Sequence, residues 1–271
     1  MPVHAVLWLI CVAWLAPVAG LLVSSLRPAA DVAATGWWTA VARPAFTLAN
    51  YRDVLTTQGI GTSVLNSVAI AAPATVIPLL LAAYAAYAFA WMRFPARGAL
   101  QALVVLLLVV PLQTTLVPVL RLFTAVRLTG TFPALWLAHT GYGLPLAVFL
   151  LRNFIAGLPA DLLDAAAIDG ADPAAVFFRV VLPLSAPAIA ALAIFQFLWV
   201  WNDLLVALSY LGGRPGVAPL TVAIAGLVSS LGSGWHLLTA AAFVSMVLPL
   251  AVFFALQRYF VRGLVAGTLK E

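Results

Sequence analysis

The chain has 271 residues, of which 65% are hydrophobic and 8% are charged, and its formal net charge is +5. Soluble domains are about a quarter charged, so this composition excludes an ordinary water-soluble fold and predicts an all-α, polytopic membrane protein. The single cysteine, Cys11, excludes a disulfide framework and a cysteine-rich metal site, and the scattered arginines form no basic run of the kind that binds nucleic acid.

Six apolar stretches have the length of membrane-spanning helices, and together they predict one transmembrane domain over 1–271. The first covers about 4–23. It lacks the basic start of a cleaved signal peptide, the alternative reading, so we expect it to be retained. After a polar segment, in which PAFTLANYRDVL predicts a short amphipathic helix, the other spans are expected at about 63–91, 99–120, 133–151, 186–210 and 236–257. Pro111 and Pro118 predict a kink in the third span.

Positive charge does not determine the orientation of these spans. If both termini face the cytoplasm, seven basic residues lie on that side and six lie outside. The positive-inside rule requires a clearer difference between the two sides. The orientation therefore depends on another feature of the chain.

That feature is the polar stretch DLLDAAAIDGADPAAVFFRVVLPL at 161–184, which holds four of the eight acidic residues. Asp161 and Asp172 are predicted to be helix N-caps, and Gly170 suits the left-handed position that ends a helix. Pro173 fits the first position of a second helix, which we expect Pro183 to end. The pattern predicts two short helices joined by a sharp corner.

The two predicted helices have different surfaces. The first carries a run of alanines at 165–167, and small residues allow another backbone to approach closely, so we expect a docking surface. The second carries an apolar face able to pack against the membrane helices: Val176, Phe177, Val180 and Val181. The alternative without a docking role is a surface connector whose acidic residues serve only as helix caps.

The segment LPADLLDAAAIDGADPAAVFFRVVLPLSAPA resembles the EAA loop in permease subunits of bacterial binding-protein-dependent ABC importers. FQFLWVWNDLLVAL resembles the fifth span of the maltose-type, sugar-uptake branch. TLANYRDVL, VLNSVAIA and LQRYFVRGLVAGTLKE extend this resemblance over nearly the whole chain. ATVIPLLLAAYAAYAFAWMRFP and WLAHTGYGLPLAVFLLRN are similar to the α-glucoside permeases within that branch.

The resemblance implies that the connector, at 159–184, inserts into a cleft on a cytoplasmic ATPase subunit. It thereby implies that both termini face the cytoplasm and that the chain lies in the bacterial inner membrane. The position at which the family usually has glutamate is Asp164, whose side chain is one methylene shorter. The implied coupling residues are Asp164, Ala165, Ala166, Ile168, Asp169, Gly170, Leu182 and Pro183.

The implied partners are a second homologous permease subunit, two cytoplasmic ABC ATPase subunits, an extracytoplasmic solute-binding protein, the sugar and the lipid bilayer. The only lysine is Lys270, so the chain has no Gly-x-x-x-x-Gly-Lys-Ser/Thr phosphate loop of its own. We therefore expect a chain that is not an enzyme and binds no cofactor, with ATP and Mg held by the ATPase subunits.

Polar side chains within membrane spans are costly and often functional. Aromatic rings cover the C–H faces of sugars, and amides and carboxylates bind their hydroxyl groups. The expected substrate pathway is lined by Gln113, Gln196, Trp199, Trp201, Asn202 and Asp203. The alternatives are bonds between helices for the polar groups and anchoring at the membrane interface for the tryptophans. We expect His139 to be a packing residue.

The predicted function is the translocation of an oligosaccharide or glucoside by alternating access, driven by separate ATPase subunits. An importer for a non-sugar solute, such as a glycerol phosphate, is the nearest alternative. An intramembrane serine protease needs Gly-x-Ser-Gly and a histidine, and the nearest match is LGSGWH around Ser233, where Leu231 replaces the first glycine. A secondary carrier or a channel would leave the connector without a purpose.

Overall fold

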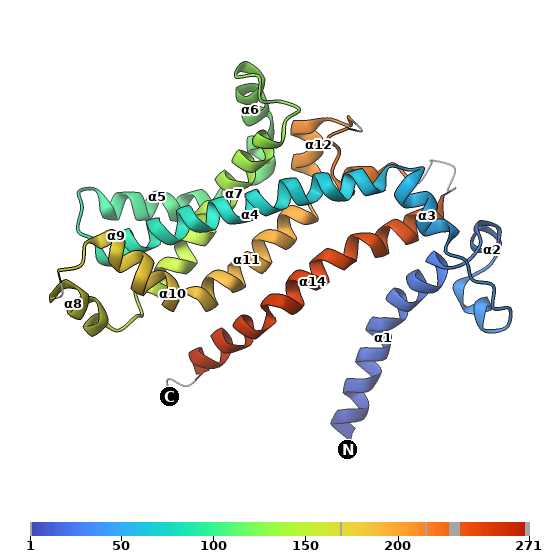
Figure 1. Cartoon of the computed structure of the whole chain (residues 1–271), viewed down its shortest axis with the longest axis horizontal. Coiled ribbons are helices and arrows are strands. Elements are labelled where there is room, and N and C mark those ends of the chain that lie inside the picture. Colours follow the sequence, from blue (N-terminus) through green and yellow to red (C-terminus); the bar gives the residue numbers. More distant parts are fainter. Residues whose placement is uncertain (1, 169, 215, 228–233, 269–271) are drawn as a thin grey trace. The chain divides into compact units, whose positions relative to one another are not determined.

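The computed structural model describes residues 2–168, 170–214, 216–227 and 234–268. Among these residues there are helices, turns and loops but no strand, which confirms the all-α prediction (Figure 1). The chain divides into two compact units. The first contains Met1–Ser67 and Pro215–Leu248, and the second contains Val68–Arg214 and Pro249–Glu271. A single domain over 1–271 stays a prediction.

The first unit begins with a long apolar helix that is followed by short helices. Its helices are α1 (Pro2–Ser25), α2 (Ala29–Ala34), the 3-10 helix η1 (Trp37–Val41), α3 (Ala49–Thr56) and α13 (Leu220–Ala225). Two long helices, α4 (Ile60–Trp91) and α14 (Trp235–Thr268), begin in this unit and continue into the second. Helix α3 confirms the short helix expected from PAFTLANYRDVL.

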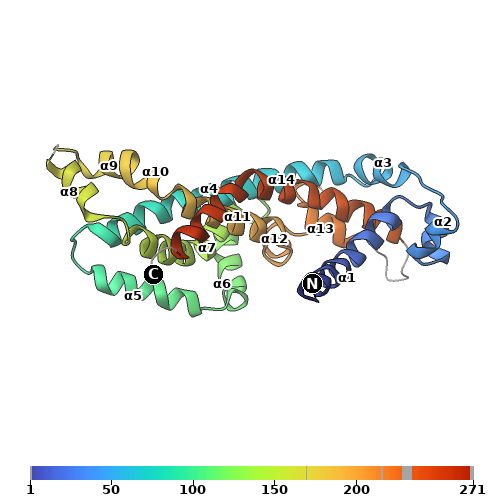
Figure 2. The same ribbon diagram turned by 90° about the horizontal axis from the view of Figure 1, so that it is seen from below.

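The second unit contains the helices between α4 and the loop at Arg214. They are α5 (Arg97–Val109), α6 (Leu112–Ala125), α7 (Phe132–Ile155), α8 (Ala160–Ile168), α9 (Pro173–Val176), the π-helical turn η2 (Phe177–Val181), α10 (Leu182–Leu184), α11 (Ala186–Trp201) and α12 (Leu205–Leu211). Helices α8, α9 and α10 lie at the same end as the turn between α4 and α5 in both views (Figure 1 and Figure 2).

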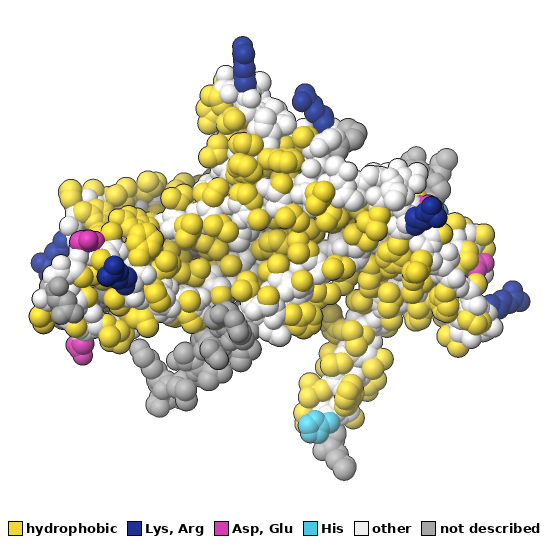
Figure 3. All heavy atoms as spheres, viewed as in Figure 1, with side chains coloured by type: hydrophobic (Ala, Val, Ile, Leu, Met, Phe, Trp, Pro, Cys, Tyr) yellow, Lys and Arg dark blue, Asp and Glu magenta, His cyan; other side chains and the backbone are white. Residues whose placement is uncertain are grey.

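Four described helices are long and apolar enough to cross a membrane: Val3–Ser25, Ile60–Trp91, Phe132–Ile155 and Trp235–Gln257. Two bent pairs also qualify if each is one span. They are Arg97–Val109 with Leu112–Ala125, bent by 104°, and Pro173–Leu184 with Ala186–Trp201, bent by 73°. Counting each pair once gives up to six spans. Hydrophobic side chains cover the surface over α4, α5 and α11, and charged ones gather beside α8 and α9 and beyond α6 (Figure 3).

The third stretch is broken where only a kink was expected. Helix α5 ends at Val109, and Val110 and Pro111 have extended backbones with ψ angles of 116° and 130°. A proline disfavours helical geometry in the residue before it, which explains the break at Val110. Pro118 lies inside α6 without a comparable break. The two halves therefore run in different directions, as Figure 2 shows.

Arg27 organises the segment that follows α1. Its side chain is only 4% exposed, and its guanidinium donates to the carbonyls of Thr35 and Gly36 and to the hydroxyls of Thr35 and Thr39 at 2.6–3.3 Å. Asn50 of α3 donates to the carbonyls of Ser25 and Arg27 at 2.9 and 2.8 Å. These bonds connect α2, η1 and α3 to the end of α1.

We predict that Arg27→Lys loosens this segment. A lysine ammonium cannot span four acceptors as the guanidinium fork does, so partly buried oxygens lose their donors, at about 1 kcal/mol for each bond lost. Hydrogen exchange should become faster at 28–47. Arg43→Lys is the matched control, because Arg43 is exposed and lines a surface pocket together with Arg27. Equal protection in both variants would contradict this role for Arg27.

Candidate functional site

The first connector helix, α8, ends in a motif that requires a glycine. Gly170 has a φ of +72°, and the amide of Ala171 donates to the carbonyl of Ala166 at 3.0 Å, the long bond of a Schellman motif. This confirms the predicted corner. The helix begins at Ala160, so Asp161 lies in its first turn and not at the predicted N-cap. Its carboxylate still interacts favourably with the positive end of the helix dipole.

The second connector helix begins as predicted and ends at Leu184, one residue after Pro183. Asp172 is its N-cap, accepting a bond from the Ala175 amide at 2.8 Å, and Pro173 takes the first helical position. At η2 the amide of Leu182 donates to the carbonyl of Phe177, five residues back. Pro183 follows this turn as the second residue of α10, and the helix ends one residue later at Leu184, where the chain bends by 73° before α11.

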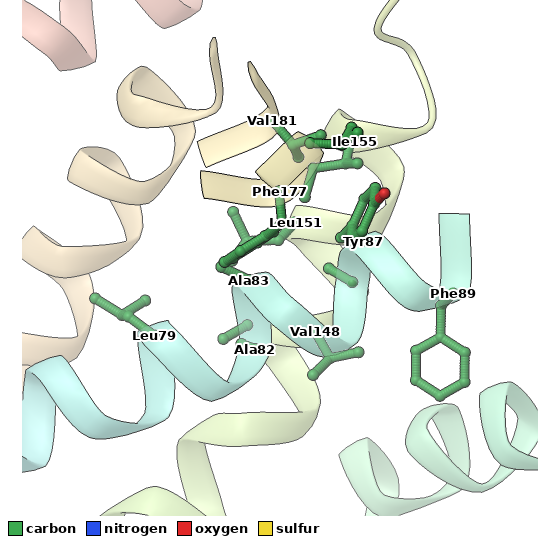
Figure 4. Packing of buried hydrophobic residues seen from close by; sticks show 13 residues of the cluster. Leu79, Ala82, Ala83, Tyr87, Phe89, Val148, Leu151, Ile155, Phe177 and Val181 are labelled. Atoms are coloured by element: carbon green, nitrogen blue, oxygen red, sulfur yellow. The ribbon is translucent and has the colours of Figure 1, made fainter. Parts of the chain in front are cut away.

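Phe177 attaches the second connector helix to the spans. It is 3% exposed, and its ring lies 5.2 Å from that of Tyr84 and 5.7 Å from that of Tyr87. The buried cluster around it joins α4, α7 and the connector (Figure 4): Leu79, Ala82, Ala83, Ala86, Tyr87, Phe89, Ala147, Val148, Leu151, Ile155, Val176, Phe177 and Val181. The predicted apolar face is therefore buried, although Val180 remains partly exposed.

The proposed coupling residues divide between an inner and an outer surface. Ala166 and Leu182 pack against the buried cluster. Ala165, Gly170 and Pro183 are exposed, and Ile168 is 85% exposed. Asp169 and the side chain of Asp164 lie outside the described residues, as does Ser233 of the protease alternative. The connector thus combines a buried anchor with an exposed outer surface.

Gln196 holds three helices of the second unit together. It is buried on α11, and its Nε2 donates to the carbonyls of Ala74 on α4 at 3.1 Å and His139 on α7 at 3.4 Å. A Cβ atom at Gly143 of α7 would lie only 2.5 Å from the Gln196 Oε1. The amide is therefore bound to backbone and packed against a glycine.

Asp203 lies two residues before α12, and its side chain contacts both that helix and α7. Its carboxylate accepts bonds from the amides of Val206 and Ala207 at 3.2 and 2.9 Å, and it lies 3.6 Å from Nε2 of His139. His139 is buried as expected, but this contact gives it more than a packing role. The stretch expected as one span at 186–210 is thus interrupted after Trp201 and restarted by the Asp203 cap.

The two tryptophans of α11 lie in different environments. Trp201 is buried and stacks on Phe197, with ring centroids 5.5 Å apart. Trp199 is 40% exposed and lines two pockets, of about 300 and 440 Å³. Asn202 is exposed and donates to the carbonyl of Leu198 in its own helix, and Gln113 is exposed in the first turn of α6.

Sequence reasoning missed Tyr142, which lines both of these pockets together with Trp199. Its hydroxyl hydrogen-bonds the hydroxyl of Tyr210 at 2.8 Å and accepts a bond from Thr115 at 3.1 Å. The only signal in the sequence was a tyrosine between two glycines within an apolar stretch. Of the expected pathway residues, Gln196 and Trp199 come together at the smaller pocket, whereas Gln113 lines neither pocket.

Comparison with known proteins places these features in a family. The family model described as "Binding-protein-dependent transport system inner membrane component" matches residues 74–265. An osmoprotective compounds uptake permease protein from Synechocystis sp. is 58% identical over 275 aligned positions, covering 100% of this chain and 92% of the relative. An alpha-glucoside transport system permease protein from Rhizobium meliloti is 54% identical over 239 positions, covering 86% of this chain and 63% of the relative.

A solved structure supports the same fold. A chain in the crystal structure of a bacterial ABC transporter involved in the import of the acidic polysaccharide alginate has a TM-score of 0.79. The alignment covers 95% of each chain, and the sequences are 19% identical. At this identity the likeness establishes the fold alone.

We predict that Gly143→Ala destabilises the second unit. The new methyl group displaces the Gln196 amide and leaves its bonds to two carbonyls broken or stretched, at about 1–3 kcal/mol. The thermal unfolding temperature of the purified protein should fall. Gly141→Ala on the same helix is the control, because no atom lies within 4 Å of its added Cβ. If both variants melt at the same temperature, Gln196 does not hold the helices as described.

Proposed function

The chain belongs to the family of binding-protein-dependent transport system inner membrane components, and from this premise we propose that it is the permease subunit of an ATP-driven importer for neutral glucosides. It works with a second, homologous permease subunit, two ABC ATPase subunits and an extracytoplasmic solute-binding protein. ATP and Mg are bound by the ATPase subunits. Solute crosses by alternating access, in which the closing ATPases tilt spans relative to one another.

The observation that carries the coupling role is the contrast between the two connector helices. The second is anchored to α4 and α7 through Phe177, so a displacement of the connector moves those helices too. The first helix, α8, exposes Ala165 and Ile168, and Gly170 is exposed at the corner that follows it. This end of the second unit is polar. An exposed isoleucine beside an alanine is a suitable contact for a cleft in a partner protein.

The orientation follows from this docking role. The ATPase subunits hydrolyse cytoplasmic ATP, so the connector faces the cytoplasm. The connector follows the fourth of six spans, so both termini lie on that side too. The coupling set comprises the eight residues expected from the resemblance. Ala165, Ile168, Gly170 and Pro183 are exposed for contact, while Ala166 and Leu182 pack inward and hold the contact surface in place.

A neutral solute fits the second unit better than a phosphate ester. No Arg, Lys, Asp or Glu appears in the described lining of either pocket beside Trp199, whereas a phosphate would require cationic partners. Trp199 offers a partly exposed ring for a sugar face. Asn202 and Gln113 are exposed at helix ends. The other three expected residues, Gln196, Trp201 and Asp203, hold the helices around the pathway in place.

The class of solute is tested by ATP hydrolysis in the reconstituted importer. The cognate binding protein is loaded with maltose, trehalose or glucosylglycerol, or with glycerol 3-phosphate as the alternative. A neutral glucoside should stimulate hydrolysis. Stimulation by glycerol 3-phosphate alone would contradict the proposed substrate class but leave the permease role intact.

We predict that Gly170→Val weakens association with the ATPase subunits. A β-branched residue at a φ of +72° is strained by at least about 1 kcal/mol, and relief of the strain moves the corner. Membrane insertion should be unchanged and the yield of ATPase in co-purification should fall. Gly98→Val is the control, because that glycine also has open space at its Cβ but no positive φ. A normal ATPase yield for Gly170→Val would refute the corner as a docking element.

We predict that Trp199→Ala and Trp201→Ala impair transport in different ways. Trp199→Ala enlarges two pockets and should lower glucoside uptake while the complex remains assembled. Trp201→Ala removes a buried, stacked ring and should destabilise the fold by about 3–5 kcal/mol. Uptake in proteoliposomes and the melting temperature separate the two effects. Normal uptake by the Trp199 variant would remove that residue from the pathway.

A further inference from the structure

A small groove in the second unit is not used by the proposed transport mechanism. It has a volume of about 190 Å³ and lies between the end of α4, the middle of α5 and the end of α7. In Figure 4, Phe89 points away from the rest of the buried cluster, towards a neighbouring helix. The groove is lined by Phe89, Gln101, Val104, Val105, Val148, Phe149, Arg152 and Asn153.

Arg152 brings a positive charge to this groove without a matching negative one. Its Nε is buried and has no hydrogen-bond partner, and its Nη1 donates to Oδ1 of Asn153 at a long 3.3 Å. Within the described part of the chain, no carboxylate lies within 4.0 Å of it. The negative end of the α7 dipole offsets part of the charge but does not supply an acceptor for Nε. A buried donor of this kind requires a partner.

No neighbouring polar group in the described part of the chain accepts a bond from this Nε. Arg97 donates to the carbonyls of Met92 and Ala90, and Gln101 donates to the carbonyl of Phe89. Arg93, in the same turn, is exposed and does not line the groove. This end of the groove is therefore cationic and offers a place for an anion from outside the chain.

The other end of the groove is apolar and open to the surface. Val104, Val105 and Phe149 form its wall, and α5 has no buried residue. Leu103 and Leu106 of α5 are exposed, so the groove continues into a surface that the hydrocarbon of the bilayer covers. A ligand that fits both ends has an anionic head and an apolar chain.

We infer that the groove binds an anionic phospholipid, with its phosphate on Arg152 and part of one acyl chain along Val104 and Val105. Basic pockets between transmembrane helices bind anionic headgroups in this way. The lipid joins α5 to α7 at the end of the unit that carries the connector. Its assignment to the cytoplasmic leaflet rests on the proposed function, whereas the site itself does not.

Lipid binding to the purified importer complex, with its partner subunits, tests the inference. The delipidated complex is titrated with phosphatidylglycerol, phosphatidylcholine or inorganic phosphate, and retained molecules are counted by native mass spectrometry. Phosphatidylglycerol should bind more tightly than phosphatidylcholine, and inorganic phosphate should not compete at equal concentration. Arg152→Gln should weaken phosphatidylglycerol binding about tenfold, the loss expected for a bond to a charged group.

Two further variants keep the test decisive. Arg93→Gln removes the same charge from an exposed position in the adjacent turn and should bind lipid as the wild type does. Val105→Trp fills the apolar wall from a partly exposed position without changing the charge, and should weaken binding of both phospholipids even if Arg152→Gln does not fold.

Three results would overturn the lipid site. One is unchanged phosphatidylglycerol binding by both Arg152→Gln and Val105→Trp. Another is full competition by inorganic phosphate, which would identify an anion site without a lipid. The third is loss of a partner subunit from Arg152→Gln with lipid binding intact, because a partner's carboxylate would then be the counter-ion. A complex that transports glucoside but retains no lipid refutes only this inference and not the proposed function.

Discussion

The packing of Phe177 against α4 and α7 is the interaction on which the rest of the second unit depends. Its ring is 3% exposed and contacts two tyrosines of α4. Truncation of a buried phenylalanine costs about 3–5 kcal/mol, a large part of the stability of most domains. No other described residue of the connector is so large and so deeply buried. The connector is therefore packed onto the spans, whereas Ala165 and Ile168 of helix α8 remain exposed.

A second constraint is that polar groups among apolar helices need partners. Gln196 and Asp203 are attractive solute-binding residues by type, yet both are engaged with the fold. One bonds two carbonyls on different helices, and the other caps α12 and contacts His139. Because an unsatisfied buried group costs more than a typical bond contributes, these partners hold α4, α7, α11 and α12 in one arrangement. Trp199 and Tyr142 are left to face the pockets.

The need of buried polar groups for partners also applies to the groove beside α5. Gln196 and Asp203 find their partners within the chain, but the Nε of Arg152 does not. In a membrane protein the bilayer is itself a source of partners, both apolar chains and anionic headgroups. The surface of α5 is consequently described better by the chemistry of lipid than by that of a soluble protein, where its exposed leucines would be anomalous.

Local rules predicted most features that depend on a residue's own backbone, although Asp161 lies in the first turn of α8 and not at its predicted N-cap. Long apolar stretches determined the helices of the spans, the glycine at 170 determined the left-handed corner, and Asp172 with Pro173 determined the start of the second connector helix. These features involve residues a few positions apart, so their spacing in the sequence carries the information.

Contacts between residues far apart in the sequence could not be predicted from local patterns and came only from the three-dimensional structure. Trp199 and Trp201 look equivalent in the sequence, but Trp199 lines two pockets and contacts His139 of α7, whereas Trp201 is buried and stacks on Phe197 of its own helix. The π turn that precedes Pro183 was not predicted, and the role of Tyr142 depends on Tyr210, which lies 68 residues away. The sequence by itself determined which segments are helical, but not the breaks at Val110 and after Trp201. The tertiary structure decided which face of each helix is buried, because burial depends on partners that the local pattern does not identify.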